Sequence, residues 1–181
     1  MKQGNEDYIT YRALTRDETP KYGEIDRYEI VEDIYYLREG KLVLEKEYYE
    51  IKGFDNMENR IKNLTEIFDN GGFLYGAFHS EKLVGLGSLR NKLIGKNNDI
   101  IQLSTMHVSA NYRKRGIATT IFSALKGKAI EFGGKKMYVT ATPSKNTVHF
   151  YMGVGFKVTD EPIPELLEQE PDDIHMEIKL L

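Results

Sequence analysis

Residues 108–119 combine the residue types and the spacing that most directly indicate ligand binding. Three consecutive cations, Arg113 to Arg115, stand before Gly116, where a long amphipathic segment begins. Free N–H groups at a helix start attract phosphate oxygens together with the helix dipole, and a glycine lets the ligand approach closely. The spacing matches neither a Walker loop nor a dinucleotide-binding fingerprint. It predicts a pyrophosphate site; the alternative is an exposed basic helix start that binds nothing.

A second motif follows after one expected strand, in residues 144–156. It begins with polar residues, continues with Phe150-Tyr151 and ends with Gly155-Phe156. Placed behind Arg113-x-x-Gly116-x-Ala118, it completes a pair of motifs that resembles the GNAT superfamily of acyl-CoA-dependent N-acyltransferases, whose pyrophosphate loop reads Q/R-x-x-G-x-G/A. The resemblance covers residues 73–181 and is looser before residue 73. It implies a mixed, mostly antiparallel central sheet that is flanked by helices and splayed at a cofactor cleft.

The resemblance places acetyl-CoA in this cleft as co-substrate. The strand at residues 102–108 would line the pantetheine arm through backbone groups, and residues 113–119 would hold the pyrophosphate. Either Ser144 or Asn146 would bond the pantetheine amides, although Ser144 could equally be a helix N-cap. The cofactor-binding residues implied in this way are Met106, His107, Val108, Arg113, Lys114, Arg115, Gly116, Ile117, Ala118, Thr119, Ser144, Asn146, Phe150 and Tyr151.

Tyr151 occupies the position where many members of the family keep a general acid. A phenol can protonate the thiolate that leaves when an amine attacks a thioester; the alternative role of Tyr151 is packing. The base is harder to assign, because residues 102–107 hold no carboxylate. Strand alternation turns His107 away from Met106, which favours a packed or surface histidine. His175 and a chain of ordered water are the other candidates, and the base stays unassigned.

Residues 18–54 match the family least, and we therefore expect them to form the acceptor side. Five carboxylates lie within residues 24–33. We single out Asp26 and Glu29 as the pair that would attract an ammonium acceptor; a solvated acidic face is the alternative for each of them. Aromatic residues in the same segment would wall a pocket, form a dimer surface or fill the core.

The function implied by the resemblance is transfer of an acetyl group from acetyl-CoA to a primary amine. The transfer would be direct, and the acceptor would be a small molecule or a peptide. The alternative is a non-catalytic acyl-CoA-binding sensor module of the same fold; the absence of a carboxylate from residues 102–107, where some members of the family carry a glutamate, leaves room for it. We expect one N-acetyltransferase domain over residues 1–181, with 18–54 as the variable acceptor-side segment and 73–181 as the cofactor-binding core.

Hydrophobic periodicity and turn residues predict the elements that position these groups. Apolar residues at i, i+4 spacing from Ile117 to Ala129 predict a helix that Gly133-Gly134 ends. Residues 28–49 predict a hairpin, with a helix as the alternative, and Asp17 is the expected N-cap of a short helix over 17–25. Together they describe an α+β or α/β chain with expected strands at 8–14, 73–78, 83–89, 100–108, 136–142, 156–159 and 174–180, further helices at 57–68 and 144–152, and an acidic loop at 162–171.

Composition excludes several classes of function. The 181 residues carry 25 basic and 28 acidic side chains and no cysteine, which argues against a nucleic-acid-binding surface, a disulfide framework and thiolate chemistry. The 4 histidines are scattered, so no metal site is predicted. No apolar run reaches the roughly 20 residues that cross a bilayer, and residues 1–11 do not resemble a signal peptide. We therefore expect a cytoplasmic protein without a membrane or nucleic-acid partner, with a homodimer left open.

Overall fold

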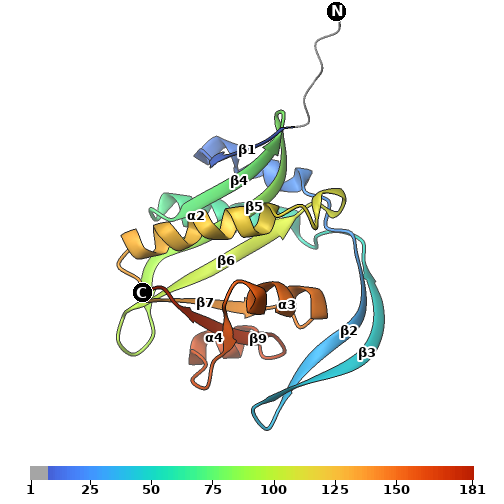
Figure 1. Ribbon diagram of the computed structural model, residues 1–181. Coiled ribbons are helices and arrows are strands. Elements are labelled where there is room, and N and C mark those ends of the chain that lie inside the picture. The colour runs from blue at the N-terminus through green and yellow to red at the C-terminus, as the bar shows by residue number, and fades with distance from the viewer. Residues whose placement is uncertain (1–7) are drawn as a thin grey trace, which may run out of the picture.

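The computed structural model describes residues 8–181 (Figure 1). Residues 1–7, on which much of the expectation about a signal peptide rests, lie outside the described part. Within residues 8–181, seven strands form one sheet in the order β1-β4-β5-β6-β7-β9-β8, and β2 and β3 form a separate hairpin. The strands are β1 Ile9–Ala13, β2 Glu29–Arg38, β3 Lys41–Ile51, β4 Phe73–His79, β5 Lys82–Ile94, β6 Ile100–Val108, β7 Lys136–Ala141, β8 Lys157–Val158 and β9 Ile174–Lys179.

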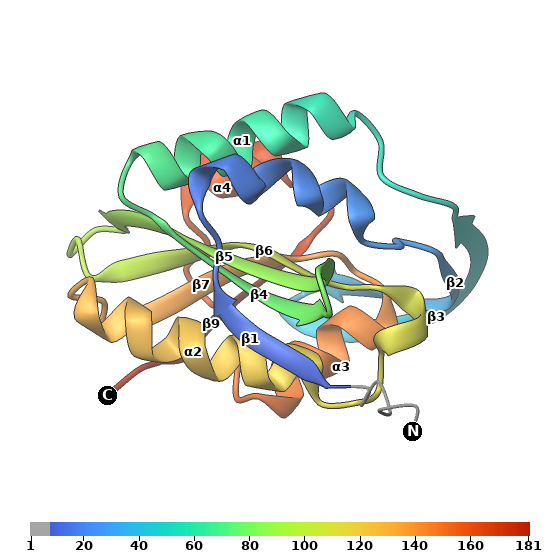
Figure 2. The same cartoon turned by 90° about the horizontal axis from the view of Figure 1, so that it is seen from above.

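Helices cover both faces of the large sheet. Figure 2 shows α1, α4 and the 3-10 helix η1 on one face, and α2 and α3 on the other. Ile121 and Leu125 of α2 belong to the larger of two buried apolar clusters, whereas Leu64 and Ile67 of α1 belong to the second. This arrangement confirms the predicted fold class, a mixed sheet flanked by helices. The helical elements are η1 Arg16–Glu24, α1 Met57–Asp69, the 3-10 turn η2 Ala110–Tyr112, α2 Ile117–Glu131, α3 Lys145–Gly153 and α4 Pro164–Gln169.

The sheet opens between its two parallel neighbours, β6 and β7. These strands pair only at Ile100, Ile101 and Gln102. Beyond that point β6 stays paired with β5, and β7 stays paired with β9. The far ends of the two strands therefore diverge, as the splayed sheet of the sequence-based prediction requires, and backbone groups along one side of each strand face the gap.

Helix α2 lies unusually close to the sheet where it crosses β5. A Cβ atom at Gly87 would stand 2.6 Å from Cγ2 of Ile121 and 2.7 Å from Cδ1 of Leu125. Real Cβ atoms do not approach other carbons so closely, so a larger residue fits here only if the side chains of Ile121 and Leu125, or the helix that carries them, shift. The close packing fixes the axis of α2 on β4, β5 and β6, and with it the position of the start of the helix at the mouth of the gap.

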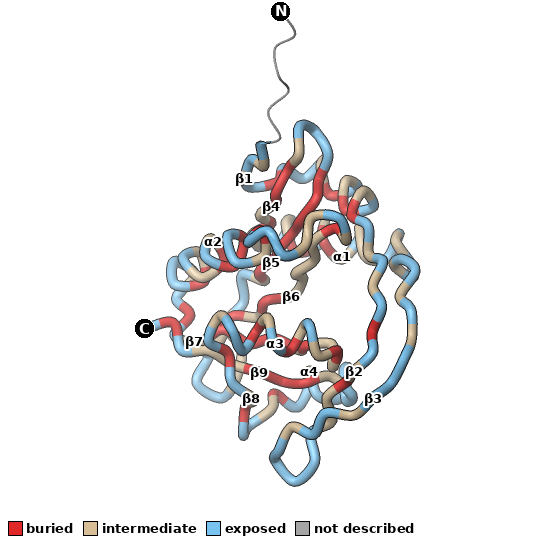
Figure 3. Tube along the Cα trace, turned by 45° about the vertical axis from the view of Figure 1, so that its right-hand side comes forward, coloured by how far each residue is buried: buried red, intermediate tan, exposed pale blue. Residues whose placement is uncertain are grey.

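The β2–β3 hairpin forms an arm outside the large sheet, and the helical alternative for this segment is wrong. Figure 1 shows the arm curving along one side of the molecule, past α3. The backbone N–H of Tyr35 donates to the carbonyl of Pro143 over 2.8 Å, which ties the arm to the loop before α3. Figure 3 shows most of the arm as exposed or half-buried, in contrast to the buried β5. The arm therefore closes one side of the open end of the sheet.

Three local expectations need correction. The N-cap of the short helix near the N-terminus is Thr15, not Asp17, and the Glu18 carboxylate accepts the Thr15 backbone N–H over 3.1 Å. The expected loop at 162–171 contains α4, a six-residue helix with Pro164 in its first turn. The strand expected at 83–89 runs on to Ile94. The first and third differences concern boundaries, where neighbouring contacts outweigh the local pattern, whereas the second is a short helix that the sequence did not predict.

Candidate active site

A cavity of about 760 Å³ occupies the gap between β6 and β7. One wall is the free side of β6 at residues 103–108, and the opposite wall comes from β7 and α3. The start of α2 lies at one end. The other end is closed by residues near the first residue of β2 and the last residue of β3, and by the loop between α4 and β9. The gap predicted from the sequence is therefore a real pocket that brings together residues from both halves of the chain.

The start of α2 is open toward this cavity. Gly116 has φ +78° and ψ 3°, a left-handed conformation that favours glycine, and no side chain in the described part of the chain caps the helix. A Cβ atom at Gly116 would meet nothing within 4 Å, so the space above it is free. Ile117, Ala118 and Thr119 line the cavity. Their N–H groups lack the intrahelical acceptors that later residues have, which is the arrangement that binds phosphate oxygens.

The three cations before Gly116 have different surroundings. Arg113 is largely engaged by the fold, since its Nε donates to the carbonyl of Val108 over 3.0 Å and its Nη1 to that of Tyr28 over 2.8 Å. Lys114 lines the cavity with its own backbone at φ +60°. Arg115 does not line the cavity; its guanidinium lies over the Tyr112 ring at 5.2 Å. Of these three cations, Lys114 alone lines the cavity without a hydrogen bond or ion pair to any of residues 8–181.

Met106, His107 and Val108 line the cavity at the end of β6. The His107 side chain is packed rather than catalytic: its Nδ1 is hydrogen-bonded to the Tyr22 hydroxyl over 2.8 Å, and Phe54 contacts its ring edge-on. Burial, with added repulsion from Arg27 and two further arginines, lowers the pKa of His107 to about 3. An imidazole with so low a pKa stays neutral and is a weak base.

Tyr151 of α3 is the polar side chain best placed to act on a ligand. It is 5% exposed, lines the cavity and packs against Phe150 and Phe156. Among residues 8–181, its hydroxyl has no hydrogen-bond partner. Burial first, and the charge of Asp173 second, raise the pKa of this phenol, so it stays protonated. A neutral, unpartnered phenol in a pocket is a ready hydrogen-bond donor.

Ser144 and Asn146 have different surroundings, although the sequence did not show which of them would face the cofactor. Ser144 is buried, and its Oγ accepts the N–H of Thr147 over 3.4 Å as the N-cap of α3. It does not line the cavity, whereas Asn146 and Phe150 do. Ser144 thus positions α3, and Asn146 is the polar group that faces the pocket.

The expected acceptor carboxylates are only partly at the cavity. Asp26 does not line it: its side chain is turned to the backbone, where Oδ1 accepts the N–H of Tyr28 over 2.9 Å. Glu29 does line the cavity, but Arg27 lies 2.6 Å from its Oε2 and neutralises its charge. An Arg60–Asp55 ion pair lies in the same wall. The sequence-based prediction placed Asp26 at the acceptor site, whereas in the structure it lies outside the cavity lining.

His175 is not placed to serve as a base. Its side chain is buried and does not line the cavity. Its Nε2 lies 2.9 Å from the carbonyl of Glu170, so this nitrogen carries the proton, and its Nδ1 accepts from the Tyr138 hydroxyl over 2.6 Å. The same hydroxyl accepts the N–H of Ile163 over 3.2 Å. The network ties both ends of α4 to the sheet.

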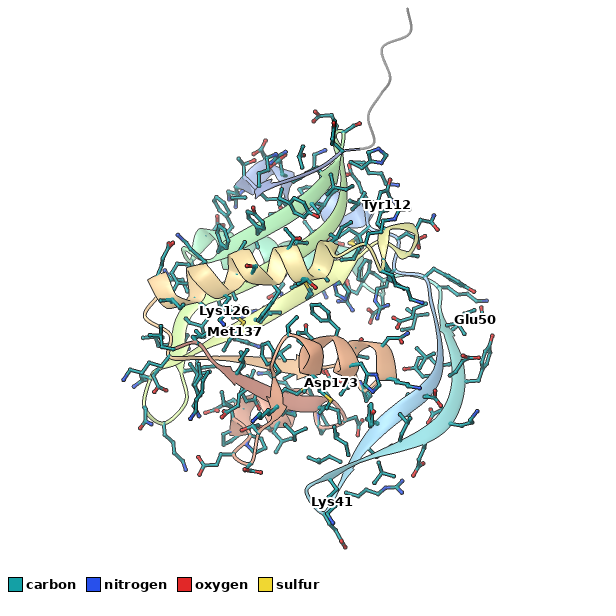
Figure 4. The ribbon with its side chains drawn as sticks, viewed as in Figure 1. Lys41, Glu50, Tyr112, Lys126, Met137 and Asp173 are labelled. Atoms are coloured by element: carbon teal, nitrogen blue, oxygen red, sulfur yellow. The ribbon has the colours of Figure 1, made fainter. Side chains whose placement is uncertain are left out.

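Sequence reasoning missed two carboxylates in the loop between α4 and β9. Glu170 and Asp173 line the cavity, and neither side chain has a hydrogen bond or ion pair within residues 8–181. Figure 4 shows Asp173 close to α3. Burial, followed by the charge of Glu170, raises the pKa of Asp173 to about 6. The only signal in the sequence was the acidic run Pro171-Asp172-Asp173, which does not reveal what the loop faces.

The family of the chain follows from a comparison with family models. The model for the acetyltransferase (GNAT) domain matches residues 42–180. The chain belongs to this family. The GNAT match confirms the resemblance that the two motifs indicated and identifies the protein as an acetyltransferase. No curated protein sequence gives a significant match to it.

Solved structures of acetyltransferases share the fold. Nourseothricin acetyltransferase is 14% identical, with a TM-score of 0.73 over 96% of this chain and 99% of that one. A protein from Bacillus anthracis str. Ames, assigned as a streptothricin acetyltransferase and in complex with acetyl-CoA, is 18% identical, with a TM-score of 0.71 over 95% and 98%. PaiA N-acetyltransferase from Thermoplasma acidophilum, in complex with coenzyme A, is 18% identical, with a TM-score of 0.63 over 95% and 99%. At these identities the likeness concerns the fold.

Two further properties concern the described part of this GNAT protein. Across residues 8–181, no three His, Cys, Asp or Glu side chains come together in a way that could hold a metal ion. In the same range, no helix has both the length and the apolar character needed to cross a membrane.

Proposed function

We propose that this acetyltransferase moves the acetyl group of acetyl-CoA directly to a primary amine of a cationic acceptor. One observation carries the proposal: a single cavity joins the uncapped start of α2 to the unpartnered hydroxyl of Tyr151 and continues to a wall with two unpaired carboxylates. A phosphate-binding end, a proton donor and an anionic end are the parts that this reaction needs.

The residues of the cavity fit acetyl-CoA. The open start of α2 suits a pyrophosphate, with Lys114 as the neighbouring cation. The unpaired side of β6 at 103–108 offers backbone groups to the amides of a pantetheine arm, in the manner of an added strand. Asn146 adds a polar side chain on the opposite wall. Solved relatives in complex with acetyl-CoA or coenzyme A support this placement.

Tyr151 is the proposed general acid. Its hydroxyl faces the cavity without a partner, and its raised pKa keeps the proton in place until a stronger base forms beside it. Attack of an amine on a thioester expels a thiolate, which is such a base. The side chain is also packed between Phe150 and Phe156. Packing is therefore compatible with the proposed acid role, because the ring contacts hold the Tyr151 side chain in position.

The acceptor is proposed to bind at the end lined by parts of residues 18–54, where Arg27, Glu29, Ile51 and Phe54 meet the loop that carries Glu170 and Asp173. The Arg27–Glu29 pair contributes little net charge, so the two carboxylates of the loop give this end its anionic character. Structural neighbours named as acetyltransferases of streptothricin and nourseothricin support a cationic amine. The remaining core, residues 73–181, would serve acetyl-CoA.

An amine panel tests this function. Purified protein with acetyl-CoA is offered nourseothricin, aminoglycosides, polyamines and a lysine peptide, and release of the CoA thiol is followed together with the mass of the product. We expect CoA release with at least one amine and a product heavier by one acetyl group. Tight binding of acetyl-CoA without release to any amine would favour the sensor alternative, which uses the fold without turnover.

A further inference from the structure

We propose that Asp173 receives the ammonium group of the acceptor and takes its proton before acetyl transfer, with Glu170 as the second anion of the same subsite. This assignment rests on the proposed function and supplies the base that the sequence leaves open. No carboxylate is available on β6 for that role. The two candidate histidines do not supply the base either, because His107 and His175 are both held in structural hydrogen bonds.

The position of Asp173 carries the assignment. It immediately precedes β9, lines the same cavity as Tyr151 and lies close to α3 (Figure 4). Tyr151 as a residue is only 5% exposed, yet its hydroxyl lacks a partner among residues 8–181. An unpartnered carboxylate and an unpartnered buried phenol therefore face one pocket. A polar ligand group is needed to satisfy them, because buried polar groups are normally hydrogen-bonded.

The charged and titratable groups around Asp173 leave it available to a cation. The neighbours from its own loop are the carboxylates Glu170 and Asp172. The other titratable neighbours are His175 of β9, Tyr151 of α3 and Tyr49 of β3. No cationic side chain of residues 8–181 pairs with either of the two carboxylates. The arginines of the same end are already matched, Arg27 by Glu29 and Arg60 by Asp55. The uncompensated negative charge therefore lies at the 170–173 loop.

The steps balance as follows. The acceptor enters as R–NH3+, and one N–H bond breaks as its proton moves to a carboxylate oxygen of Asp173, which leaves R–NH2 with a free electron pair. That pair forms the new C–N bond at the thioester carbonyl while the C–S bond breaks. The sulfur takes the phenolic proton of Tyr151, and the nitrogen returns one proton to the Tyr151 oxygen. Asp173 then releases its proton to water, so the net products are R–NH–acetyl, the CoA thiol and one proton.

The environment of Asp173 suits this exchange. Its raised pKa of about 6 keeps it ionised at neutral pH, yet makes it a stronger base than an ordinary aspartate. Its negative charge also helps to raise the pKa of Tyr151. When Asp173 is protonated, that repulsion disappears and the phenol becomes a better acid. Proton uptake from the acceptor thus prepares the proton donor for the leaving group.

The test compares Asp173→Asn with Asp172→Asn, the exposed carboxylate next to it. With nourseothricin or the best amine of the panel, we expect Asp173→Asn to lower kcat/KM for the amine about 10²–10⁴-fold and to leave the Kd of acetyl-CoA unchanged. Asp172→Asn should keep wild-type activity. In the wild type, kcat/KM should rise as the pH increases through about 6, and this limb should be missing in Asp173→Asn. Asp173→Glu should restore part of the rate.

Each outcome decides between the assignments. Equal rates for Asp173→Asn and Asp172→Asn would overturn the role of Asp173 and leave the proposed function intact. A slow Asp173→Asn variant that keeps the limb near pH 6 would also overturn it, because the loss would then be structural. A wild-type protein that releases CoA to none of the amines would overturn the proposed function and this role together.

Discussion

The open start of α2 allows the phosphate-binding role of the cavity to be tested at one atom. Gly116→Asp adds a Cβ where nothing lies within 4 Å, so it creates no clash with the protein itself. It places a carboxylate beside N–H groups that would otherwise meet a pyrophosphate. Loss of a charge-assisted contact of about 1.5–3 kcal/mol weakens binding by about 10–150-fold. We therefore expect the Kd of acetyl-CoA to rise at least tenfold.

The backbone contributes a separate effect that a second variant isolates. Gly116 has φ +78°, so any L-residue at this position is strained. The strain is about 1–2 kcal/mol and acts on the stability of the fold. Gly116→Ala carries this strain without the charge. In calorimetric titrations with acetyl-CoA, we expect Gly116→Ala to bind more tightly than Gly116→Asp, while both variants unfold at similar urea concentrations.

Gly127→Asp is the matched control on the same helix. Gly127 is exposed, a Cβ atom there also meets nothing within 4 Å, and it lies away from the cavity. The control carries the same change in net charge as Gly116→Asp, and we expect a wild-type Kd. Equal affinities of Gly116→Asp and Gly127→Asp for acetyl-CoA would refute the placement of the pyrophosphate at the start of α2.

Four further predictions concern catalysis and stability. Tyr151→Phe should lower kcat about 10²–10⁴-fold with unchanged acetyl-CoA affinity, whereas Tyr48→Phe on the exposed arm should match the wild type in the same CoA-release assay. Tyr138→Phe removes a hydroxyl with two buried partners, and we expect urea unfolding to show a loss of about 1–3 kcal/mol. Gly87→Ala places a Cβ against Ile121 and Leu125 of α2, so the packing of α2 on the sheet must shift, which should cost about 1–3 kcal/mol in the same assay. Because His107 has a folded-state pKa of about 3 and an unfolded histidine one of about 6.5, protons bind the unfolded chain preferentially between these values; stability should fall as the pH drops through that window, and His107→Gln should reduce the slope by up to about 1.4 kcal/mol per pH unit.

Features set by short stretches of chain could be predicted from the sequence. The start of α2 is an example, because a glycine, three cations and an apolar stripe lie within a few residues and each has a local physical meaning. The splayed sheet followed from the family resemblance and is confirmed by the short pairing of β6 with β7. Strand alternation predicted that His107 is a packed or surface histidine; in the structure it is packed and faces Tyr22, while Met106 faces the opposite side.

The acceptor end could not be predicted, because its charges depend on contacts between distant segments. Asp26 and Glu29 looked alike in the sequence, but one bonds the backbone and the other pairs with Arg27. Asp173 looked like one more carboxylate of an acidic loop. Its place in the cavity arises because the Tyr138–His175 hydrogen bonds hold that loop against the sheet. No pattern within a short stretch records which carboxylate finds a partner and which does not.

The divergence of β6 from β7 also affects how the chain can change in evolution. Along residues 103–108 the strand edge that is not paired with β7 presents main-chain groups to the cavity, and nearly every amino acid supplies the same N–H and C=O. Substitutions along this wall therefore preserve its donors and acceptors as long as pairing with β5 holds the strand in place. A binding surface of this kind tolerates wide drift in sequence, and its presence is detected in backbone geometry rather than in residue identity.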